Sequence, residues 1–405
     1  MREDCITITL GLPEFRVLEV VEDENLIAVW VERVGIEELC PNCGSLSSKV
    51  HDVRFDDVWD QPIWDKGVLL WVHKRRYLCV NTSCLRHRWQ DPFPEQYDDL
   101  DLSARRTKRF DRYIYRLAKR MPNTDVVKEL KQCHVAISDQ TVGRIYNRLG
   151  DKELAGFEWG RVVVLGIDEY SIRKQHTYAT IITNPIKHLV LETFPKRDQK
   201  TVQAHLEALF PASQIKIVVI DMSRAFRGAA LAAFPGVKIV IDKFHVIGVV
   251  IAALDETRKR VQRSKPKGQK NPVYRLRHLL RKDREELDAE EQARLQAALD
   301  QESDLQMAYQ LKEAFRDWYR ILIPQYAAQR LQEWYKQAET TGFAEWQEAV
   351  RTLQNWEYDI LNYFYWRVTN GFTEGSNNTV KVVKRRGYGY RNFDNLRRRI
   401  LLEGT

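Results

Sequence analysis

The sequence of 405 residues lacks any long apolar segment. Its longest apolar run, residues 246–254, spans nine residues, well short of the ~20 needed to cross a bilayer. The opening residues MREDCITITL contain no apolar core of a secretory signal. Only six cysteines are present, and without an export signal they argue against a disulfide framework. We therefore expect a protein of the reducing cytoplasm, with no membrane association.

Negative charge is scarce in parts of the chain, whose net charge is +8. Residues 258–270 carry seven bases and no acid, and residues 105–120 carry eight bases against Asp111 alone. Such a bias favours an anionic partner, most often nucleic acid. Hydrophobic residues at 44% and charged residues at 30% are typical of a globular protein, and the length predicts two to four domains.

The first 150 residues change from a strand-like to a helix-like pattern. Alternating apolar runs in residues 6–34 predict strands, and GVLLWVHKRRYLC alternates like one arm of a β-hairpin. Residues 103–149 predict a helix capped by Ser103, then TDVVKELKQC as a second helix, and after a tight connection a helix capped by Ser138. This succession is a helix-turn-helix pattern, although plain helical packing produces the same one.

From residue 161 on, apolar strands alternate with helices. RVVVLGID and IKIVVID are predicted buried strands that end in an acid, and VKIVID repeats the pattern before a helix. Residues 255–365 are predicted to be wholly helical, and the last forty residues return to helix. The sequence therefore predicts an α/β fold with a large helical segment inside it.

Four cysteines form two close pairs, Cys40 with Cys43 and Cys79 with Cys84, separated by 35 residues. Two chelating pairs on short turns suit tetrahedral Zn²⁺. Because four thiolates close the coordination sphere, this zinc would be structural and not catalytic. The alternative is four unrelated buried cysteines.

Three acids form a candidate site for catalytic metals. Asp168 and Asp221 end apolar strands, where ligands of α/β proteins gather, although either alone is more simply a turn former or helix cap. With Glu374 they supply hard oxygen ligands for two Mg²⁺ or Mn²⁺ ions acting on a phosphodiester. Asp242 and His245 after the next strand are either a helix cap with a buried histidine or a support beside the metals.

Basic and polar side chains supply candidate DNA contacts. Glu374 is the one acid in FTEGSNNTVKVVKRRGYGYRNF. The bases that follow it there can bind phosphates or form a solvated basic face: Lys381, Lys384, Arg385, Arg386 and Arg391. Near the start of the helix after Ser138, the candidates for groove contacts are Gln140, Thr141 and Arg144. Asn377 and Asn378 either position the start of the last helix or contact DNA.

In this order, the motifs resemble the ISL3 family of bacterial insertion-sequence transposases over nearly the whole chain. The resemblance rests on CPNCG with RRYLCVNTSC, then GIDEYSIRKQHTYATII, VVIDMSRAFRGAA, IVIDKFHV and NGFTEGSNNTVKVVKRRGYGYRNFDNLRRRIL. It implies a DDE recombinase with an RNase H-like mixed-sheet core, interrupted by an all-helical insertion and preceded by a zinc-binding β domain and a helix-turn-helix. Asp168, Asp221 and Glu374 would be the catalytic triad.

The resemblance also implies a domain plan and an activity. In chain order, the domains would be N-terminal strands (1–39), a zinc-binding domain (40–95), a helix-turn-helix (100–150), the first part of the core (160–250), the insertion (251–365) and the last part of the core (366–405). The activity would be binding of terminal inverted repeats, strand cleavage, and transfer of 3′-hydroxyl ends to target DNA by a homodimer.

Two other functions compete with transposition. One is a zinc and helix-turn-helix DNA-binding regulator with an inactive core, and the three intact acids count against it. The other is an RNase H-like nuclease that cuts without joining, and the dedicated end-binding modules count against that.

Overall fold

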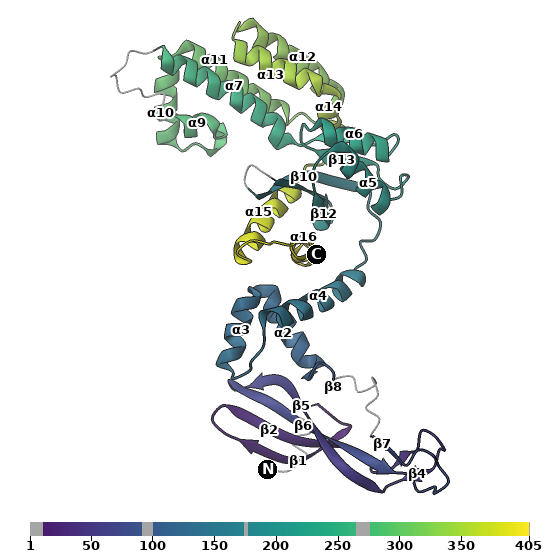
Figure 1. The fold of residues 1–405 in the computed structure, drawn as a ribbon. Helices are drawn as coiled ribbons and strands as arrows, with labels where there is room; N and C mark the ends of the chain where they lie inside the picture. Colours follow the sequence, from purple (N-terminus) through teal and green to yellow (C-terminus); the bar gives the residue numbers. More distant parts are fainter. Residues whose placement is uncertain (1–10, 91–99, 174–176, 265–275, 405) are drawn as a thin grey trace. The chain divides into compact units, whose positions relative to one another are not determined.

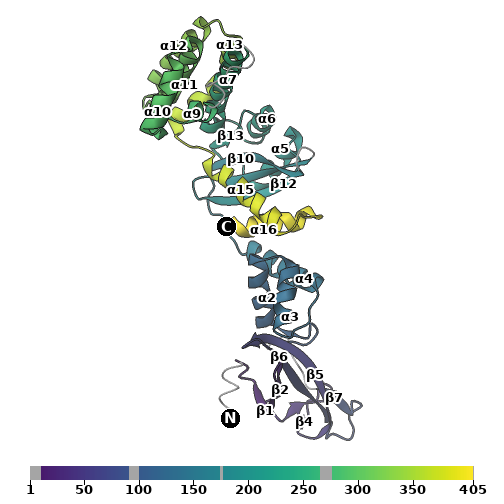
Figure 2. The same ribbon diagram turned by 90° about the vertical axis from the view of Figure 1, so that its left-hand side faces the viewer.

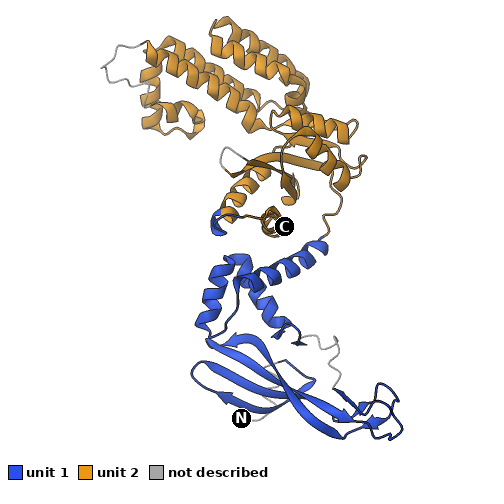
Figure 3. Cartoon of the chain, viewed as in Figure 1, with its two compact units in different colours: residues 1–157, 385–390 blue, residues 158–384, 391–405 orange. Residues whose placement is uncertain are grey.

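A computed structural model describes residues 11–90, 100–173, 177–264 and 276–404 (Figures 1 and 2). The chain divides into two compact units: unit 1 comprises residues 1–157 and 385–390, and unit 2 comprises residues 158–384 and 391–405 (Figure 3). The predicted strand in ITITL and the end of the predicted zinc-binding domain lie outside the described residues. Within the described ranges, no helix is both long and apolar enough to cross a membrane.

Unit 1 is built on a seven-stranded sheet, ordered β1-β2-β6-β5-β9-β8 with β7 beside β6. Its strands are β1 (Phe15–Glu22), β2 (Leu26–Arg33), β5 (Val50–Ile63), β6 (Lys66–Leu78), β7 (Arg88–Gln90), β8 (Leu100–Asp101) and β9 (Arg106–Thr107). Because β2 pairs in parallel with β6, the N-terminal strands share one sheet with the strand that precedes Cys79, whereas β3 (Glu38–Leu39) and β4 (Leu46–Ser47), on either side of Cys40 and Cys43, pair in a separate small sheet. Alternate residues of β6, Val68, Leu70 and Val72, are fully buried, as the predicted alternation requires.

Three helices follow in unit 1: α2 (Lys108–Arg120), α3 (Asn123–Gln132) and α4 (Asp139–Ala155), and they pack against one another. Ser138 caps α4 as predicted, since its Oγ accepts a hydrogen bond from the Thr141 amide at 3.1 Å. The prediction that Ser103 caps the first helix is wrong. Residues 106–107 pair with β8 as a short strand, so α2 begins only at Lys108 and Thr107 is its cap.

Unit 2 contains a five-stranded mixed sheet with the order β12-β11-β10-β13-β14. Its strands are β10 (Val164–Arg173), β11 (Thr177–Asn184), β12 (Leu189–Pro195), β13 (Ile217–Ile220) and β14 (Lys238–Ile241). Short connections join β10, β11 and β12, which are antiparallel. Strands β13 and β14 lie parallel to β10. Because parallel neighbouring strands need a crossover connection, usually a helix, each is preceded by one: α5 (Gln199–Leu209) comes before β13 and α6 (Arg224–Ala233) before β14.

Helices cover both faces of this sheet. Figures 1 and 2 show α5 and α6 on one side and α15 (Gly371–Arg386) and α16 (Phe393–Glu403) on the other. Leu165 and Ile167 of β10 belong to the core that includes α5 and α6. Gly166 between them faces α15, because a Cβ there would meet Asn370 and Thr373. Even-numbered residues of β10 therefore point toward α15.

The segment between β14 and α15 is built from helices in its described residues, in agreement with the predicted helical segment. Its elements are α7 (Lys243–Arg263), α9 (Arg277–Arg281), the 3₁₀ turn η1 (Arg284–Glu286), α10 (Ala289–Leu299), α11 (Ser303–Trp318), α12 (Pro324–Thr340), α13 (Ala344–Asn355) and α14 (Glu357–Trp366). The first helix starts at Lys243, inside the segment predicted as core. The last of these helices, α14, returns to the sheet, where Asn362 Nδ2 donates to the Ile239 carbonyl of β14 at 2.7 Å.

Candidate active site and zinc centre

The four predicted zinc ligands lie together in unit 1. Cys40 and Cys43 lie between β3 (Glu38–Leu39) and β4 (Leu46–Ser47), and Cys79 and Cys84 follow β6. Their Sγ atoms all lie within 4.8 Å of one another, at 3.9 Å for Cys40–Cys84 and 3.6 Å for Cys43–Cys79. These distances exceed a disulfide bond of ~2.05 Å. They match the ~3.8 Å edge of a tetrahedron with Zn–S bonds of ~2.3 Å.

The local structure prepares the cysteines for a metal. Gly44, at φ +70°, allows the tight turn in which its amide donates to the Cys40 carbonyl at 2.8 Å. Hydrogen bonding with the side chain and backbone of Ser45 lowers the pKa of Cys43 to about 6, whereas desolvation raises the pKa of Cys79 to about 12. Thiols so close together cannot all ionise without a cation, so metal binding would release protons.

Asp168 in β10 and Asp221 directly after the neighbouring β13 occupy corresponding positions in unit 2. Asp221 directly follows β13, as predicted. Asp168 lies inside β10 and not at its end, contrary to the prediction, because β10 continues in antiparallel pairing with β11. Gly166 of β10 pairs with Val219 of β13, and each aspartate comes two residues later. Both therefore follow the face of the sheet that carries α15.

The surroundings of these two acids favour a cation. Burial, with the charge of Asp221 adding to it, raises the pKa of Asp168 to about 6, although the Glu169 amide donates to its Oδ1 at 2.7 Å. Burial also raises the pKa of Asp221. Asp221 Oδ1 is buried and has no hydrogen-bond donor among the described residues. A divalent ion would satisfy that oxygen and stabilise both carboxylates in their charged form.

Glu374 lies in the first turn of α15 and is exposed. One turn later, Asn377 Nδ2 donates to Asp168 Oδ2 at 2.8 Å and to the Glu169 carbonyl at 3.3 Å. Since three residues advance a helix by ~4.5 Å, the turn with Glu374 adjoins the turn that contacts Asp168. In the described part of the chain, the four cysteines are the one group of three or more possible metal ligands whose ligand atoms all lie within 4.8 Å of one another. Asp168 and Asp221 thus lie near each other, and Glu374 lies on the turn of α15 next to the one that contacts Asp168, but the three acids do not form such a cluster.

Asp242 and His245 are not the helix cap and buried histidine of the simpler prediction. Asp242 is 4% exposed and occupies the cap position of α7, but its side chain does not cap that helix. Instead its Oδ1 accepts a hydrogen bond from the backbone N–H of Asn370 at 2.9 Å. His245 is exposed, so the interpretation as a buried histidine is wrong. Its charge acts to lower the pKa values of both Asp168 and Asp221, which places it near these acids.

The candidate bases on and after α15 have different surroundings. Lys381 is exposed and its Nζ donates to Asn378 Oδ1 at 2.9 Å. Lys384 is half-buried, its Nζ donates to the Ser171 carbonyl of β10 at 2.6 Å, and burial lowers its pKa. Its ammonium group is therefore engaged by the sheet. The others are exposed or half-exposed: Arg385, Arg386 and Arg391.

The candidate groove contacts lie at the start of α4. Gln140 and Arg144 are exposed and, four residues apart, share one face of the helix. The Thr141 hydroxyl instead lies 2.9 Å from Ser138 Oγ, within the cap. The basic segment 105–120 supplies α2, where Arg112 and Arg116 are exposed one turn apart; neither was among the predicted site residues.

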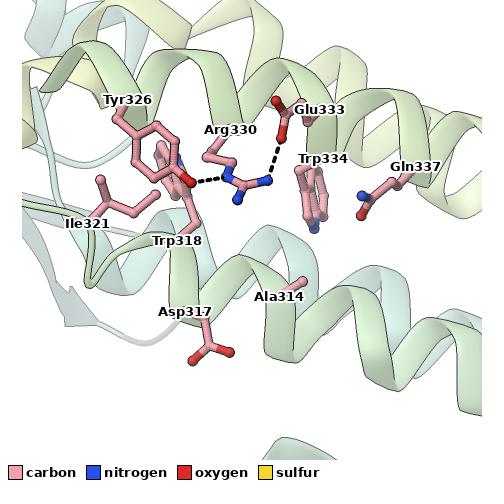
Figure 4. A pocket seen from close by; sticks show the side chains of 9 residues that line it. All are labelled: Ala314, Asp317, Trp318, Ile321, Tyr326, Arg330, Glu333, Trp334 and Gln337. Carbon is pink, nitrogen blue, oxygen red and sulfur yellow. Dashed lines mark hydrogen bonds and ion pairs between the residues drawn. The ribbon is translucent and has the colours of Figure 1, made fainter. Parts of the chain in front are cut away.

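A pocket of about 390 Å³ lies between α11 and α12 (Figure 4). Along α12, Arg330 donates to the Tyr326 hydroxyl and to Glu333, each at 2.7 Å. The indole N–H groups of Trp318 and Trp334 donate to backbone carbonyls. These polar groups are satisfied within the protein, and no predicted site residue lines the pocket.

Comparison with known proteins identifies the class. Residues 165–400 match the DDE family model described as a transposase, and residues 37–84 match the zinc-finger of transposases IS204/IS1001/IS1096/IS1165. The chain is 30% identical to the transposase for insertion sequence element IS1001 of Bordetella parapertussis, across 90% of this chain and 88% of that protein. It is 24% identical to the transposase for insertion sequence element IS1557 of Mycobacterium tuberculosis, across 71% and 69%. The chain belongs to the ISL3 family of transposases, as its motifs predict.

Proposed function

We propose that the chain is an active DDE transposase, in which Asp168, Asp221 and Glu374 hold two Mg²⁺ or Mn²⁺ ions. It binds the terminal inverted repeats of an insertion sequence, cleaves the ends and transfers their 3′-hydroxyls to target DNA. The observation that carries the proposal is the corresponding position of the two aspartates, each two residues beyond the paired Gly166 of β10 and Val219 of β13. The hydrogen bond from Asn377 to Asp168 holds the helix of Glu374 beside them.

The topology of unit 2 supports an RNase H-like core. Three antiparallel strands are followed by two parallel strands, in the order β12-β11-β10-β13-β14. The helices between β14 and α15 then form the all-helical insertion. In this assignment the core is completed by α15, which carries the third acid.

The residues of the site fit a pair of hard divalent ions. Asp168, Asp221 and Glu374 offer carboxylate oxygens, and Asp221 Oδ1 has no donor among the described residues. Bound there, two such ions would activate the attacking water or 3′-hydroxyl and stabilise the leaving oxygen. The protein positions the acids in advance through the sheet and through Asn377. Exposed Glu374 is accessible from solvent, where a DNA strand would approach.

The DNA contacts divide between the two units. In unit 1, α3 and α4 would act as a helix-turn-helix, with Gln140 and Arg144 on the groove side. Arg112 and Arg116 lie on α2, the helix before this motif, where both are exposed and would bind phosphates. On and after α15, the bases that would contact phosphates are exposed or half-exposed, and among them Arg386 also donates to the Lys119 carbonyl at 3.4 Å: Lys381, Arg385, Arg386 and Arg391.

The remaining parts of the proposal concern assembly. The zinc holds the turns around the four cysteines in place and takes no part in chemistry. Joining two element ends requires both to be gathered, so a homodimer forms on the DNA. The reaction takes place in the cytoplasm, on double-stranded DNA of the element and of the target.

The test replaces Glu374 by Gln, with Glu348→Gln as control. Glu348 is an exposed glutamate of α13 in the same unit, so both variants lose one exposed charge. Labelled element-end DNA is assayed for binding, for cleavage, and for joining of pre-cleaved ends with Mg²⁺ or Mn²⁺. We expect Glu374→Gln to bind the ends without cleaving or joining, and the control to behave as the wild type.

Other outcomes decide between the competing functions. Normal cleavage by Glu374→Gln refutes the triad. Wild-type protein that cuts the ends but never joins pre-cleaved DNA is the nuclease. Wild-type protein that binds the ends and does neither with either ion is the regulator.

A further inference from the structure

The buried face of α15 is polar in its N-terminal half, before it becomes apolar at Val380 and Val383. Asn370 just before the helix is 3% exposed, Thr373 is 0% exposed and Asn377 is 9% exposed. Burying an amide or hydroxyl costs free energy unless it is hydrogen-bonded. A helix that only had to cover a sheet would present apolar residues there. The contacts of these three residues must therefore explain their presence.

The contacts of Asn370 and Thr373 hold the start of the helix on the sheet. Asn370 accepts at Oδ1 a hydrogen bond from Thr373 and donates through Nδ2 to the Ile167 carbonyl of β10 at 3.3 Å. The Thr373 hydroxyl also lies 2.7 Å from the hydroxyl of Thr183 in β11. A Cβ on Gly166 would lie under 3.0 Å from side-chain oxygens of Asn370, Thr373 and Thr183. Glycine at this position lets the polar cluster approach the strand closely.

The third contact reaches the first candidate metal ligand. Asn377 donates to Asp168 Oδ2 at 2.8 Å and to the Glu169 carbonyl at 3.3 Å. The other carboxylate oxygen, Oδ1, accepts from the Glu169 amide. Each oxygen of Asp168 thus receives one hydrogen bond, which restrains the rotation of the carboxylate and leaves each oxygen with acceptor capacity for a cation.

We propose that Asn377 is a positioning residue, which orients the Asp168 carboxylate for a divalent metal ion and couples that orientation to the seating of α15. This inference rests on the proposed function, because Asp168 is taken as a metal ligand. Partners that orient a ligand raise metal affinity typically 10–100-fold. Asn377 does not touch the metal or the DNA in this scheme; it acts through Asp168.

A purely structural role for Asn377 makes a different prediction, and Asn362 supplies the matched control. Asn362 of α14 is 7% exposed, lies in the same unit, and donates through Nδ2 to a backbone carbonyl of β14. Truncating either residue removes one buried amide and its hydrogen bonds. Both changes should lower the free energy of unfolding, but only the loss of Asn377 should change metal binding.

The experiment measures Mn²⁺ binding to the full-length, zinc-loaded protein by electron paramagnetic resonance of the free ion. Asp168→Asn defines the signal without the site, and zinc content is verified for every variant. We expect Asn377→Ala to bind Mn²⁺ about 10–100-fold more weakly than the wild type, and Asn362→Ala to bind it equally well. If Asn377→Ala does not fold, Asn377→Leu, which is close to it in volume, is expected to show the same loss.

The outcomes separate this inference from the proposed function. If Asp168→Asn weakens Mn²⁺ binding but neither Asn377 variant does, the positioning role is refuted and the metal site stands. Equal weakening by Asn362→Ala also refutes it, since the effect would then follow general destabilisation. If Asp168→Asn binds Mn²⁺ like the wild type, the metal assignment fails and this inference fails with it.

Discussion

Replacing Asp168 by Asn should stabilise the protein in the absence of a divalent metal. A free aspartate titrates near 3.9, whereas burial raises the pKa of Asp168 to about 6. Its folded-state pKa lies above the unfolded value, so ionisation destabilises the fold, and the penalty grows as the pH rises from about 4 to about 6 and levels off above that. The difference of about two pH units corresponds to ~3 kcal/mol at pH 8.

Part of that gain is lost through hydrogen bonds. The asparagine of the Asp168→Asn variant would keep an oxygen for the Glu169 amide, but its amide group would face Nδ2 of Asn377. Turning the Asn377 amide over restores that bond at the expense of the one to the Glu169 carbonyl, at a cost of about 1 kcal/mol. The expected net gain is about 1–2 kcal/mol, or ~2–8 °C in Tm for a unit of this size.

Calorimetry in magnesium-free buffer measures this gain, without chelator so that the zinc stays bound. By linkage, the electrostatic part of the gain should be about half as large at pH 5 as at pH 8. Adding Mg²⁺ should then stabilise the wild type and not the variant. The control Glu348→Gln, which removes an exposed charge, should leave Tm unchanged. A variant no more stable than the wild type at pH 8, or a gain independent of pH, would refute the reasoning.

Three further changes test other parts of the molecule. Cys84→Ser should abolish binding of one zinc per chain in metal analysis while Cys133→Ser retains it, and zinc retention by the first variant would contradict the four-cysteine site. Gly166→Ala should lower the free energy of unfolding by about 1–3 kcal/mol, because its Cβ would crowd three buried oxygens, whereas Gly248→Ala in α7 has no atom within 4 Å; equal effects would disprove the close approach. Arg112→Ala should weaken binding to element ends and reduce the slope of log affinity against log salt by about 1, and an unchanged slope would remove α2 from the DNA contacts.

Local features of the structure were predictable from local sequence. The cysteine spacing places two chelating pairs on short turns, and the structure brings all four sulfurs together. Ser138 was found as a cap because its partner amide lies only three residues away. The prediction that Ser103 is a cap is wrong because the start of the helix depends on a pairing between strands. Pairing of β9 with β8 delays the helix to Lys108, and the sequence around Ser103 does not reveal that pairing.

The site shows the same limit more strongly. Asp168 was expected at a strand end because the apolar run stops there, but pairing with β11 extends the strand past it. Asn370 was not recognised at all, since its partner carbonyl, that of Ile167, lies 203 residues away in the sequence. The one local signal was Gly166 within a buried strand, because glycine there marks a close approach. It could not indicate which segment approaches.

The hydrogen bond between Asp242 and Asn370 has a consequence for how this protein can change. It joins residues 128 positions apart, at the points where the chain leaves the sheet and where it returns. The entropy of closing a loop grows only slowly with its length. The chain can therefore lose or gain helices between β14 and α15 while the two ends of this segment meet in the same way. The sheet can keep its architecture while this helical segment evolves as a replaceable module.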